Sequence, residues 1–382
     1  MIFIICVILC FNGLLSKFIN VATFLDEVLI VLLVIYQIIL IFQKGKIRPQ
    51  DTIILCVFII SGLITTYNQT IMSVILANIF FLKFYLSTKL ISKLSPRTLI
   101  AFRDLIFYLS IIGALLQIFF SDFFNLYLLS RELDRGNLSL VLSGFQLNPN
   151  YLALTMVIMF ATSGHHFVRK ILIVPVLAFT GSRTALVGGV ILSSLFRRRF
   201  GVKFTISILI FLTIISLYFY VSGIAEIISR DLSRISSSIG SNLYIRGIIM
   251  NMAVYGSIEH FPFGYGFGNF ATPGSWNTEV YANFGISNLH FFTEKSSSVF
   301  DSNVSSILGT SGILGLLCFG YFTYSTVSPW LQSYTFKVKM LIIFSLFSIG
   351  LMLPIFSNAS LALVMALLMR LKHYENSTDK QL

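Results

Sequence analysis

Charged residues are scarce in this sequence. They make up 11% of its 382 residues, whereas 56% are hydrophobic and the mean hydropathy is +0.87. An ordinary soluble domain carries roughly 25% charged residues, so the composition excludes that class and predicts a polytopic membrane protein. The first apolar run begins at Met1, a second run follows it, and no small-residue cleavage site lies between them. We therefore expect a retained membrane span rather than a signal peptide.

Cysteine is also rare, and its positions exclude two kinds of site. The four residues, Cys6, Cys10, Cys56 and Cys318, all fall in apolar runs. Their spacing is not that of metal ligands. We therefore expect small hydrophobic core residues, no disulfide, no metal site and no cofactor.

Acidic residues are fewer than basic ones, at 15 against 27, which gives a formal net charge of +12. A charge of this size raises the question of a nucleic-acid partner. The basic residues, however, form short clusters between apolar runs, which is the pattern of the positive-inside rule. Because no basic face interleaved with aromatic residues occurs, we expect no nucleic-acid binding.

Apolar runs of about 20 residues are long enough to cross a bilayer. Such runs lie near 1–16, 25–43, 52–67, 70–88, 99–120, 147–164, 202–222, 303–323, 338–354 and 356–371.

Residues 165–199 allow two interpretations. A single span over 171–196 would place the arginines at 197–199 on the outer side, against the positive-inside rule. Two short helices over 165–181 and 182–199, with a turn at Gly181–Ser182, keep both basic clusters inside. We favour the second interpretation. The expected fold is then an all-α polytopic membrane protein, a single membrane domain over 1–382 with about 12 transmembrane helices and both termini cytoplasmic.

The charge distribution supports this orientation. The segments expected inside hold 19 of the 27 basic residues and four acidic ones, a net charge of +15, and the outer segments have a net charge of −3. Two outer loops are long enough for function, a smaller one over 121–147 and a large one over 223–302. In the large loop, residues 242–258 are patterned as an amphipathic helix whose apolar stripe runs through Leu243, Ile248, Met252 and Tyr255.

Arginine dominates the basic residues on the outer side. Six of the eight are arginine, a side chain whose planar, bidentate donors suit phosphate oxygens. Arg183 interrupts the apolar run "LAFTGSRTALVGG" at 177–189 and has no acidic residue within 40 positions. A charge at that depth is expensive and marks a functional site. Arg246 lies on the amphipathic helix, and its nearest acids are Asp231 and Glu259. Four further arginines lie near acids that offer a purely structural pairing: Arg131, Arg135, Arg230 and Arg234.

Four segments in order resemble the bacterial O-antigen polymerase and ligase superfamily (the Wzy and WaaL types). They are "TGSRTALVGG" around Arg183, "QLNPNYLAL" at 146–154, "YIRGIIMNMAVYGSIEHFPFGYGFGNF" at 244–270 and "DSNVSSILGTSGILGLL" at 301–317. The resemblance covers about 146–317 and includes the number of spans.

The resemblance implies a fold and a reaction. The family's enzymes are metal-independent, inverting glycosyltransferases with a GT-C-like membrane fold. They act on undecaprenyl-diphosphate-linked glycans at the periplasmic face of the bacterial inner membrane. By resemblance, Arg183 and Arg246 would stabilise the diphosphate leaving group, and a chain-length regulator protein is a further possible partner.

The acceptor hydroxyl needs a base, and Asp301 is the expected one. Alternatively, Asp301 has the purely structural role of an N-terminal cap for the following span. If Asp301 is not the base, the other candidates are Glu259, His260 and His290. Ligases of this superfamily carry a His-Asn pair where this chain has Ser302-Asn303. That difference favours a polymerase, with a ligase or a lipid-linked oligosaccharide flippase as alternatives.

Substrate contacts are expected from a wider set of residues. Trp276 and Tyr281 are suited to stack on sugars or to lie at the membrane interface. Gly264, Gly266 and Gly268 follow no strand, so we expect a tight turn near membrane or substrate rather than a nucleotide loop. The complete set of expected substrate-binding residues is Arg131, Arg135, Arg230, Arg234, Asn150, His260, Trp276 and Tyr281.

Overall fold

The computed structural model describes most of the chain, and within that part every regular element is a helix. The described residues are 2–19, 25–44, 71–129, 141–163, 167–180, 182, 245–273, 275–276, 279–287, 290–293, 297–332, 334–351 and 353–378. The expected all-α class is therefore confirmed for this part of the chain.

The helices follow the apolar runs closely. In the first half they are α1 (Ile2–Cys10), α2 (Asn12–Phe18), α3 (Leu25–Lys44), α5 (Ile71–Ser92), α6 (Pro96–Phe119), α7 (Ser121–Phe123), the π-helix η2 (Phe124–Leu129), the 3₁₀-helix η3 (Gly144–Gln146), α8 (Pro149–Thr162) and α9 (Phe167–Thr180). In the second half they are α13 (Ile245–Glu259), α14 (Glu279–Asn283), α15 (His290–Thr293), η4 (Ser297–Phe300), α16 (Asn303–Val327), η5 (Ser328–Leu331), α17 (Phe336–Gly350) and α18 (Ala359–Thr378).

Three helical segments are long and apolar enough to cross a membrane: Met72–Ser92, Pro96–Phe119 and Asn303–Leu331. Two apolar helices, α8 and α17, are shorter. The expected first span is divided at Phe11 into α1 and α2. Two other expected spans, 52–67 and 202–222, lie outside the described residues, as does all of the span over 182–199 except Ser182.

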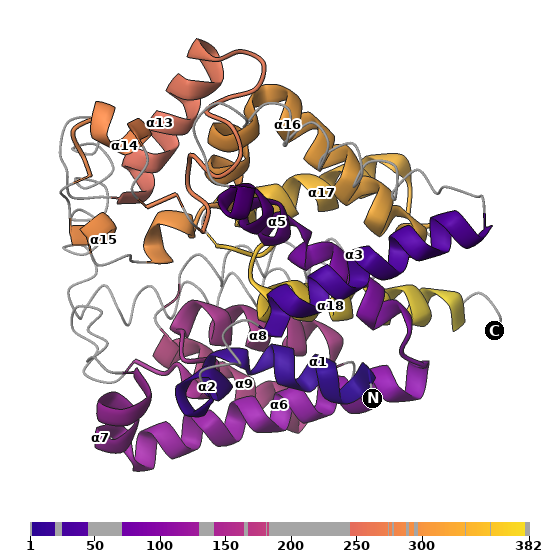
Figure 1. Ribbon diagram of the computed structural model, residues 1–382. Helices are drawn as coiled ribbons and strands as arrows, with labels where there is room; N and C mark the ends of the chain where they lie inside the picture. Colours follow the sequence, from indigo (N-terminus) through magenta and orange to yellow (C-terminus); the bar gives the residue numbers. More distant parts are fainter. Residues whose placement is uncertain are drawn as a thin grey trace.

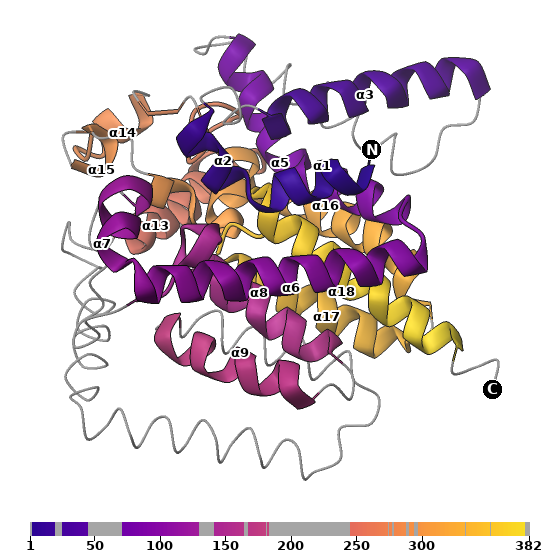
Figure 2. The same ribbon diagram turned by 90° about the horizontal axis from the view of Figure 1, so that it is seen from below.

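Helix α18 forms the centre of the core. Every residue from Leu361 to Met369 is buried, and α5, α8, α1 and α6 pack around it. Figure 2 shows α1, α6 and α18 running side by side along the bundle. A helix that is apolar on all sides is stable only when it is enclosed in this way.

One end of the bundle collects the cations. Arg103 on α6 donates to the carbonyl oxygen of Thr162 at the end of α8, and Asp104 pairs with Arg169 at the start of α9. Arg370 on α18 lies over the Trp330 ring of η5. The start of α1 and the end of α18 lie on the same side, at the right of Figure 1. We call this the basic end; it holds Lys89, Lys93, Arg97, Arg103, Arg169, Lys170, Lys339, Arg370 and Lys372.

The opposite end is tied together by Gln117. Its side-chain oxygen accepts from the backbone N–H groups of Ser143 and Gly144, and its side-chain nitrogen donates to the Val141 carbonyl. The Leu142 N–H donates to the carbonyl oxygen of Phe179, near the end of α9. Helix α9 ends at Thr180 and Ser182 is not helical, so an uninterrupted helix over 171–196 is wrong, whereas the second expected helix falls on residues 183–199, outside the described residues.

A buried charge cluster corrects one detail of the expected topology. Lys83, one of the 19 basic residues expected on the inside, lies well within α5 and is buried. Its Nζ is 2.7 Å from both Asp26 and Glu27 in the first turn of α3, residues expected on the outer side. The cluster therefore joins two helices within the bundle, where each charge depends on its partners.

The free cysteines follow the expectation only in part. Cys6 and Cys10 are buried, whereas Cys318 on α16 is exposed. Cys56 lies outside the described residues. The apolar run around Cys318 is therefore not evidence of burial in the protein core.

Candidate functional site

Two of the three expected catalytic residues meet at the end opposite the basic end. Helix α13 begins at Ile245, which places Arg246 in its first turn, and Asp301 immediately precedes the cap of α16. The Arg246 Nη2 donates to the Asp301 Oδ2 at 2.6 Å. The two side chains are 25% and 23% exposed, so the pair is held in the protein but remains accessible.

Asp301 does not cap α16, so that alternative is wrong. The N-cap is Ser302, whose Oγ accepts a hydrogen bond from the Ser305 N–H at 3.3 Å. Because Ser302 fills this role, the Asp301 carboxylate is directed to Arg246 instead.

Asn303 fixes the start of α16 against the segment before α18. Its Oδ1 accepts from the Phe356 N–H at 2.8 Å, and its Nδ2 donates to the Ser357 Oγ. Asn303 is fully buried, and a buried amide with both ends bonded holds a fixed position. The site therefore rests on a rigid junction between two helices.

Tyr151 brings the "NPNY" segment to the same place. Asn148 caps α8 by accepting from the Asn150 N–H, and Pro149 occupies the first turn. The Tyr151 side chain forms a hydrogen bond with Asn358 and interacts electrostatically with Asp301 and Arg246. Sequence reasoning missed Tyr151, although the motif containing Asn150, one residue earlier, pointed to this position. Asn150 itself is only partly buried.

The rival bases on α13 are far from Arg246. Glu259 and His260 lie at the opposite end of this helix, about 20 Å away at 1.5 Å per residue. Their side chains are about half exposed and lie 3.7 Å apart. His260 therefore does not belong to the Arg246–Asp301 site. The side chain of His290, in α15, is outside the described part of the structure.

The glycine-rich turn docks into a break in α16. Gly312 adopts φ +65° inside this helix. The Gly309 and Thr310 carbonyls accept from the Tyr265 and Gly266 N–H groups, and the Leu314 N–H donates to the Pro262 carbonyl. The turn was expected to approach membrane or substrate. The structure shows that it supplies hydrogen bonds to backbone groups of the broken helix, and its approach to membrane or substrate stays a prediction.

The buried face of α13 agrees with the expected stripe only in part: Met252 is buried and Ile248 is half-buried. Ile245, Ile249, Met252 and Gly256 are buried, whereas Tyr255 is 52% exposed. Leu243 lies outside the described residues. The helix packs on α16, and Ala253 approaches Gly309 so closely that an added Cβ there would lie 3.2 Å from the Ala253 Cα.

Tyr281 belongs to the core of the large loop, so its expected role in stacking on sugars is wrong. It is fully buried, and its hydroxyl oxygen accepts from the Ala271 N–H at 2.7 Å. Burial raises the pKa of Tyr281 to about 12. Trp276 is half-buried against Phe300, with ring centroids 4.5 Å apart.

Five expected arginines lie outside the described residues: Arg131, Arg135, Arg183, Arg230 and Arg234. The neighbouring Ser182 is described and buried.

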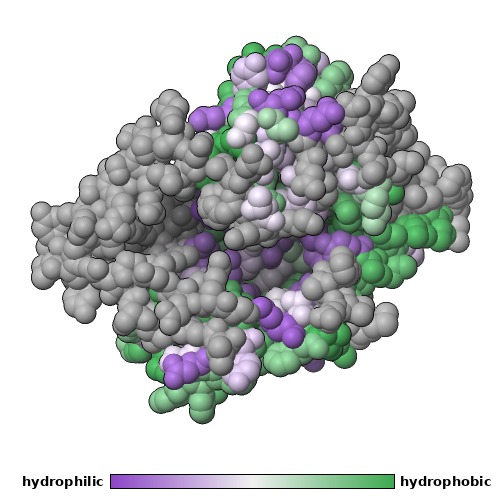
Figure 3. All heavy atoms as spheres, turned by 60° about the vertical axis from the view of Figure 1, so that its left-hand side comes forward, coloured by the Kyte–Doolittle hydropathy of each residue, from purple (hydrophilic) through white to green (hydrophobic). Residues whose placement is uncertain are grey.

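Figure 3 brings the α13 side of the molecule forward and shows hydrophilic side chains around a hollow in its surface. Among the described residues, no group of three His, Cys, Asp or Glu side chains is placed to hold a metal ion.

Comparison with known proteins adds no assignment. No protein-family model and no curated protein matches this sequence.

Proposed function

We propose that this chain is an O-antigen polymerase, a metal-independent inverting glycosyltransferase. It transfers a growing glycan from undecaprenyl diphosphate to the terminal sugar of a lipid-linked repeat unit. The observation that best supports the proposal is the accessible Arg246–Asp301 pair beside Tyr151. It joins a phosphate-binding side chain to a carboxylate at one place, as the reaction requires.

The reaction forms one bond and breaks another at the anomeric carbon of the donor sugar. The acceptor hydroxyl oxygen attacks this carbon from the face opposite the diphosphate, so the configuration inverts. The bond from carbon to diphosphate oxygen breaks, and the negative charge collects on the leaving group. Arg246 stabilises that charge, with Arg183 as the second cation.

The ion pair suggests how Arg246 and Asp301 change partners. A diphosphate carries more charge than a carboxylate and offers several oxygens to a guanidinium. When it binds Arg246, Asp301 is released to accept the proton of the acceptor hydroxyl. Tyr151, held by Asn358, supplies a neighbouring hydroxyl that orients the acceptor sugar.

The proposed setting is the bacterial inner membrane. The protein has about 12 transmembrane helices in a GT-C-like arrangement, with the basic end cytoplasmic and the Arg246 site periplasmic. The gathering of cations at one end of the described bundle supports this orientation through the positive-inside rule. A chain-length regulator protein is a further proposed partner.

A ligase receives less support. Its characteristic histidine position is occupied by Ser302, which caps α16, and the adjacent Asn303 is bonded to the segment before α18.

One observation favours a flippase or another transporter, namely the break of α16 at Gly312. Discontinuous helices form the binding sites of many transporters. Here, however, backbone groups exposed by the break are bonded to residues 262–266 rather than offered to a ligand. We therefore prefer the enzyme.

Deletion of the gene, followed by complementation and a glycan gel, separates the three functions. A single capped repeat on lipid A indicates a polymerase. Polymer on the carrier but none on lipid A indicates a ligase, and the absence of outer-face units indicates a flippase. Only the first result agrees with the proposal.

A further inference from the structure

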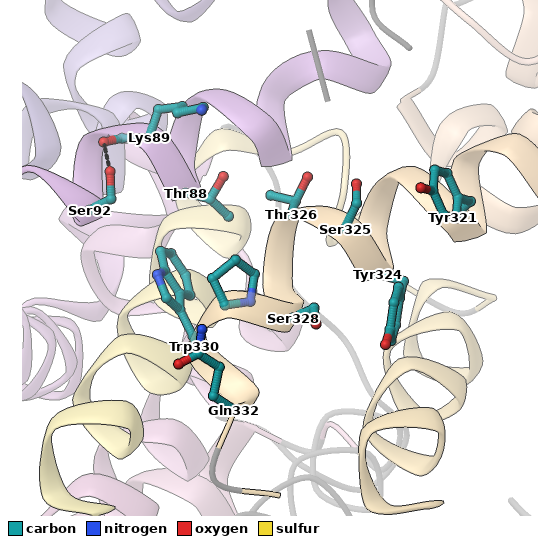
Figure 4. A pocket seen from close by; sticks show the side chains of 11 residues that line it. Thr88, Lys89, Ser92, Tyr321, Tyr324, Ser325, Thr326, Ser328, Trp330 and Gln332 are labelled. Carbon is teal, nitrogen blue, oxygen red and sulfur yellow. Dashed lines mark hydrogen bonds between the residues drawn. The ribbon is translucent and has the colours of Figure 1, made fainter. Parts of the chain in front are cut away.

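A second site lies at the basic end. A cavity of about 570 Å³ opens between the end of α5 and the junction of α16 with η5. It is separated from Asp301 by the length of α16. Figure 4 shows the side chains around it, which are Thr88, Lys89, Ser92, Tyr321, Tyr324, Ser325, Thr326, Ser328, Pro329, Trp330 and Gln332.

The lining of this cavity favours an anion. Among the described residues that line it, Lys89 is the one charged residue, and none is an aspartate or glutamate. The Lys89 Nζ lies 4.8 Å from the centroid of the Tyr85 ring, one helical turn earlier on α5. Arg370 does not line the cavity, but its guanidinium lies 5.7 Å from the centroid of the Trp330 ring, which does. A lining with a lysine, several hydroxyls and no carboxylate among its described residues suits a phosphate-bearing ligand.

Thr326 supplies an independent indication of a ligand. Its side chain lines the cavity and the residue is only 7% exposed, yet its Oγ1 has no hydrogen-bond partner in the part of the chain that the structure describes. Figure 4 shows the Thr326 hydroxyl pointing to the same side as those of Thr88 and Ser325. A buried hydroxyl without a partner is costly, so a bound acceptor would remove that cost.

The surface next to the cavity is suited to an acyl chain. Three exposed side chains on α16 follow one another at intervals of three and four residues: Leu314, Leu317 and Tyr321. Ser325, in the cavity lining, comes four residues after Tyr321. Residues at these intervals share one face of a helix. An apolar stripe therefore leads from the polar cavity along α16. Tyr321, Tyr324 and Trp330 also have the amphipathic rings typical of a membrane interface.

We propose that this cavity binds the phosphate headgroup of an anionic phospholipid. Lys89 and Thr326 contact the phosphate, and an acyl chain lies along Leu314, Leu317 and Tyr321. Basic pockets between transmembrane helices commonly take such headgroups. The site is independent of the glycosyl transfer proposed above, which takes place at the other end of α16.

The intrinsic fluorescence of Trp330 provides the assay. The chain contains two tryptophans, so the Trp276→Phe variant of the full-length protein leaves Trp330 as the single reporter. The purified protein in neutral detergent is titrated with dioctanoyl phosphatidylglycerol, dioctanoyl phosphatidylcholine and inorganic phosphate. We expect a saturable change with phosphatidylglycerol and binding at least tenfold weaker with the other two.

Two substitutions and one matched control locate the site. Lys89→Gln is expected to weaken phosphatidylglycerol binding at least tenfold and Thr326→Val about fivefold. Lys93→Gln removes the same charge from an exposed position nearby that does not line the cavity, and it is expected to change binding less than twofold.

Three outcomes would overturn the proposal. One is the absence of saturable binding, and another is an equal effect of Lys89→Gln and Lys93→Gln. The third is equal affinity for inorganic phosphate and phosphatidylglycerol, which would show that the cavity binds a soluble phosphate compound rather than a phospholipid.

Discussion

Arg246 and Asp301 lie 55 residues apart in the sequence, yet their side chains form an ion pair of 2.6 Å. The pair joins the first turn of α13 to the start of α16 and lies next to Tyr151 of α8. Three segments of the chain thus converge on one accessible cation and one accessible carboxylate. The pair also neutralises both charges when no substrate is bound, so a ligand that takes over Arg246 changes the state of Asp301.

Removing the guanidinium is expected to abolish polymer. Arg246→Ala should lower the rate of chain extension by at least about 100-fold, because a preorganised donor to the leaving group is lost. Arg246→Lys keeps the charge but not the planar donors, and should recover only part of the activity. Glycan gels of complemented deletion strains measure the effect, with Arg97→Ala at the exposed basic end as the control. A normal glycan ladder from Arg246→Ala would remove this residue from the mechanism.

Asp301 and its neighbour Ser302 should separate chemistry from helix capping. Asp301→Asn keeps the size of the side chain and should slow extension by roughly 10²–10⁴-fold through loss of the base. Ser302→Ala should cost about 1 kcal/mol of stability through loss of the cap but leave substantial activity. Extension rates normalised to folded protein check both variants. Near-normal activity of Asp301→Asn would show that another group accepts the proton.

The break in α16 should tolerate no side chain. An added Cβ at Gly312 would lie 2.1 Å from the Pro262 carbonyl oxygen, and its φ of +65° is unfavourable for other residues. Gly312→Ala should therefore lower the thermal unfolding temperature in detergent by several degrees, equivalent to roughly 1–3 kcal/mol. Gly320→Ala is the matched control on the same helix, where the nearest atom would be 3.8 Å away. Equal unfolding temperatures would contradict the docking of residues 262–266.

Tyr281 should affect stability rather than sugar binding. Tyr281→Phe keeps the ring but leaves the buried Ala271 N–H without its acceptor, which should cost roughly 1–3 kcal/mol. Tyr255→Phe, at an exposed ring on α13, should change the unfolding temperature little. Thermal unfolding and chain extension are measured together. If Tyr281→Phe leaves stability unchanged and lowers extension, the structural role of this hydroxyl is wrong.

Chelation should leave the reaction intact. The proposed site stabilises the leaving diphosphate with arginines, so extension in the presence of EDTA should proceed at the untreated rate. A parallel sample with excess Mg²⁺ controls for effects of the chelator on the membrane. Loss of extension on chelation, with recovery on adding the metal, would contradict the metal-independent mechanism.

The helices were the most predictable part of the fold. The run near 70–88 corresponds to α5 at Ile71–Ser92, and the run near 99–120 to α6 at Pro96–Phe119. Apolar length and flanking basic residues determine such boundaries directly. The helix expected at 242–258 is α13, but its buried face was predicted only in part, because Met252 is buried and Tyr255 is exposed. That face is selected by close packing on α16, which local periodicity does not contain.

The sequence allowed the residues of the candidate site to be chosen by type, but it did not predict which of them lie next to one another. Arg246 and Asp301 were chosen separately, one for phosphate chemistry and one as a base, and their pairing depends on how α13 packs on α16. Tyr151 carried no charge that would single it out. Lys83 was counted only as one of the basic residues expected on the inside. Its partners on α3 became apparent only in the fold.

Reconstituted chain extension tests the central claim most directly. The purified protein is incorporated into vesicles with undecaprenyl-diphosphate-linked repeat units, and the products are separated on a gel. The account predicts a glycan ladder from the unmodified protein and only single units from folded Arg246→Ala and Asp301→Asn. A ladder from both variants, or only single units from the folded unmodified protein, would contradict it.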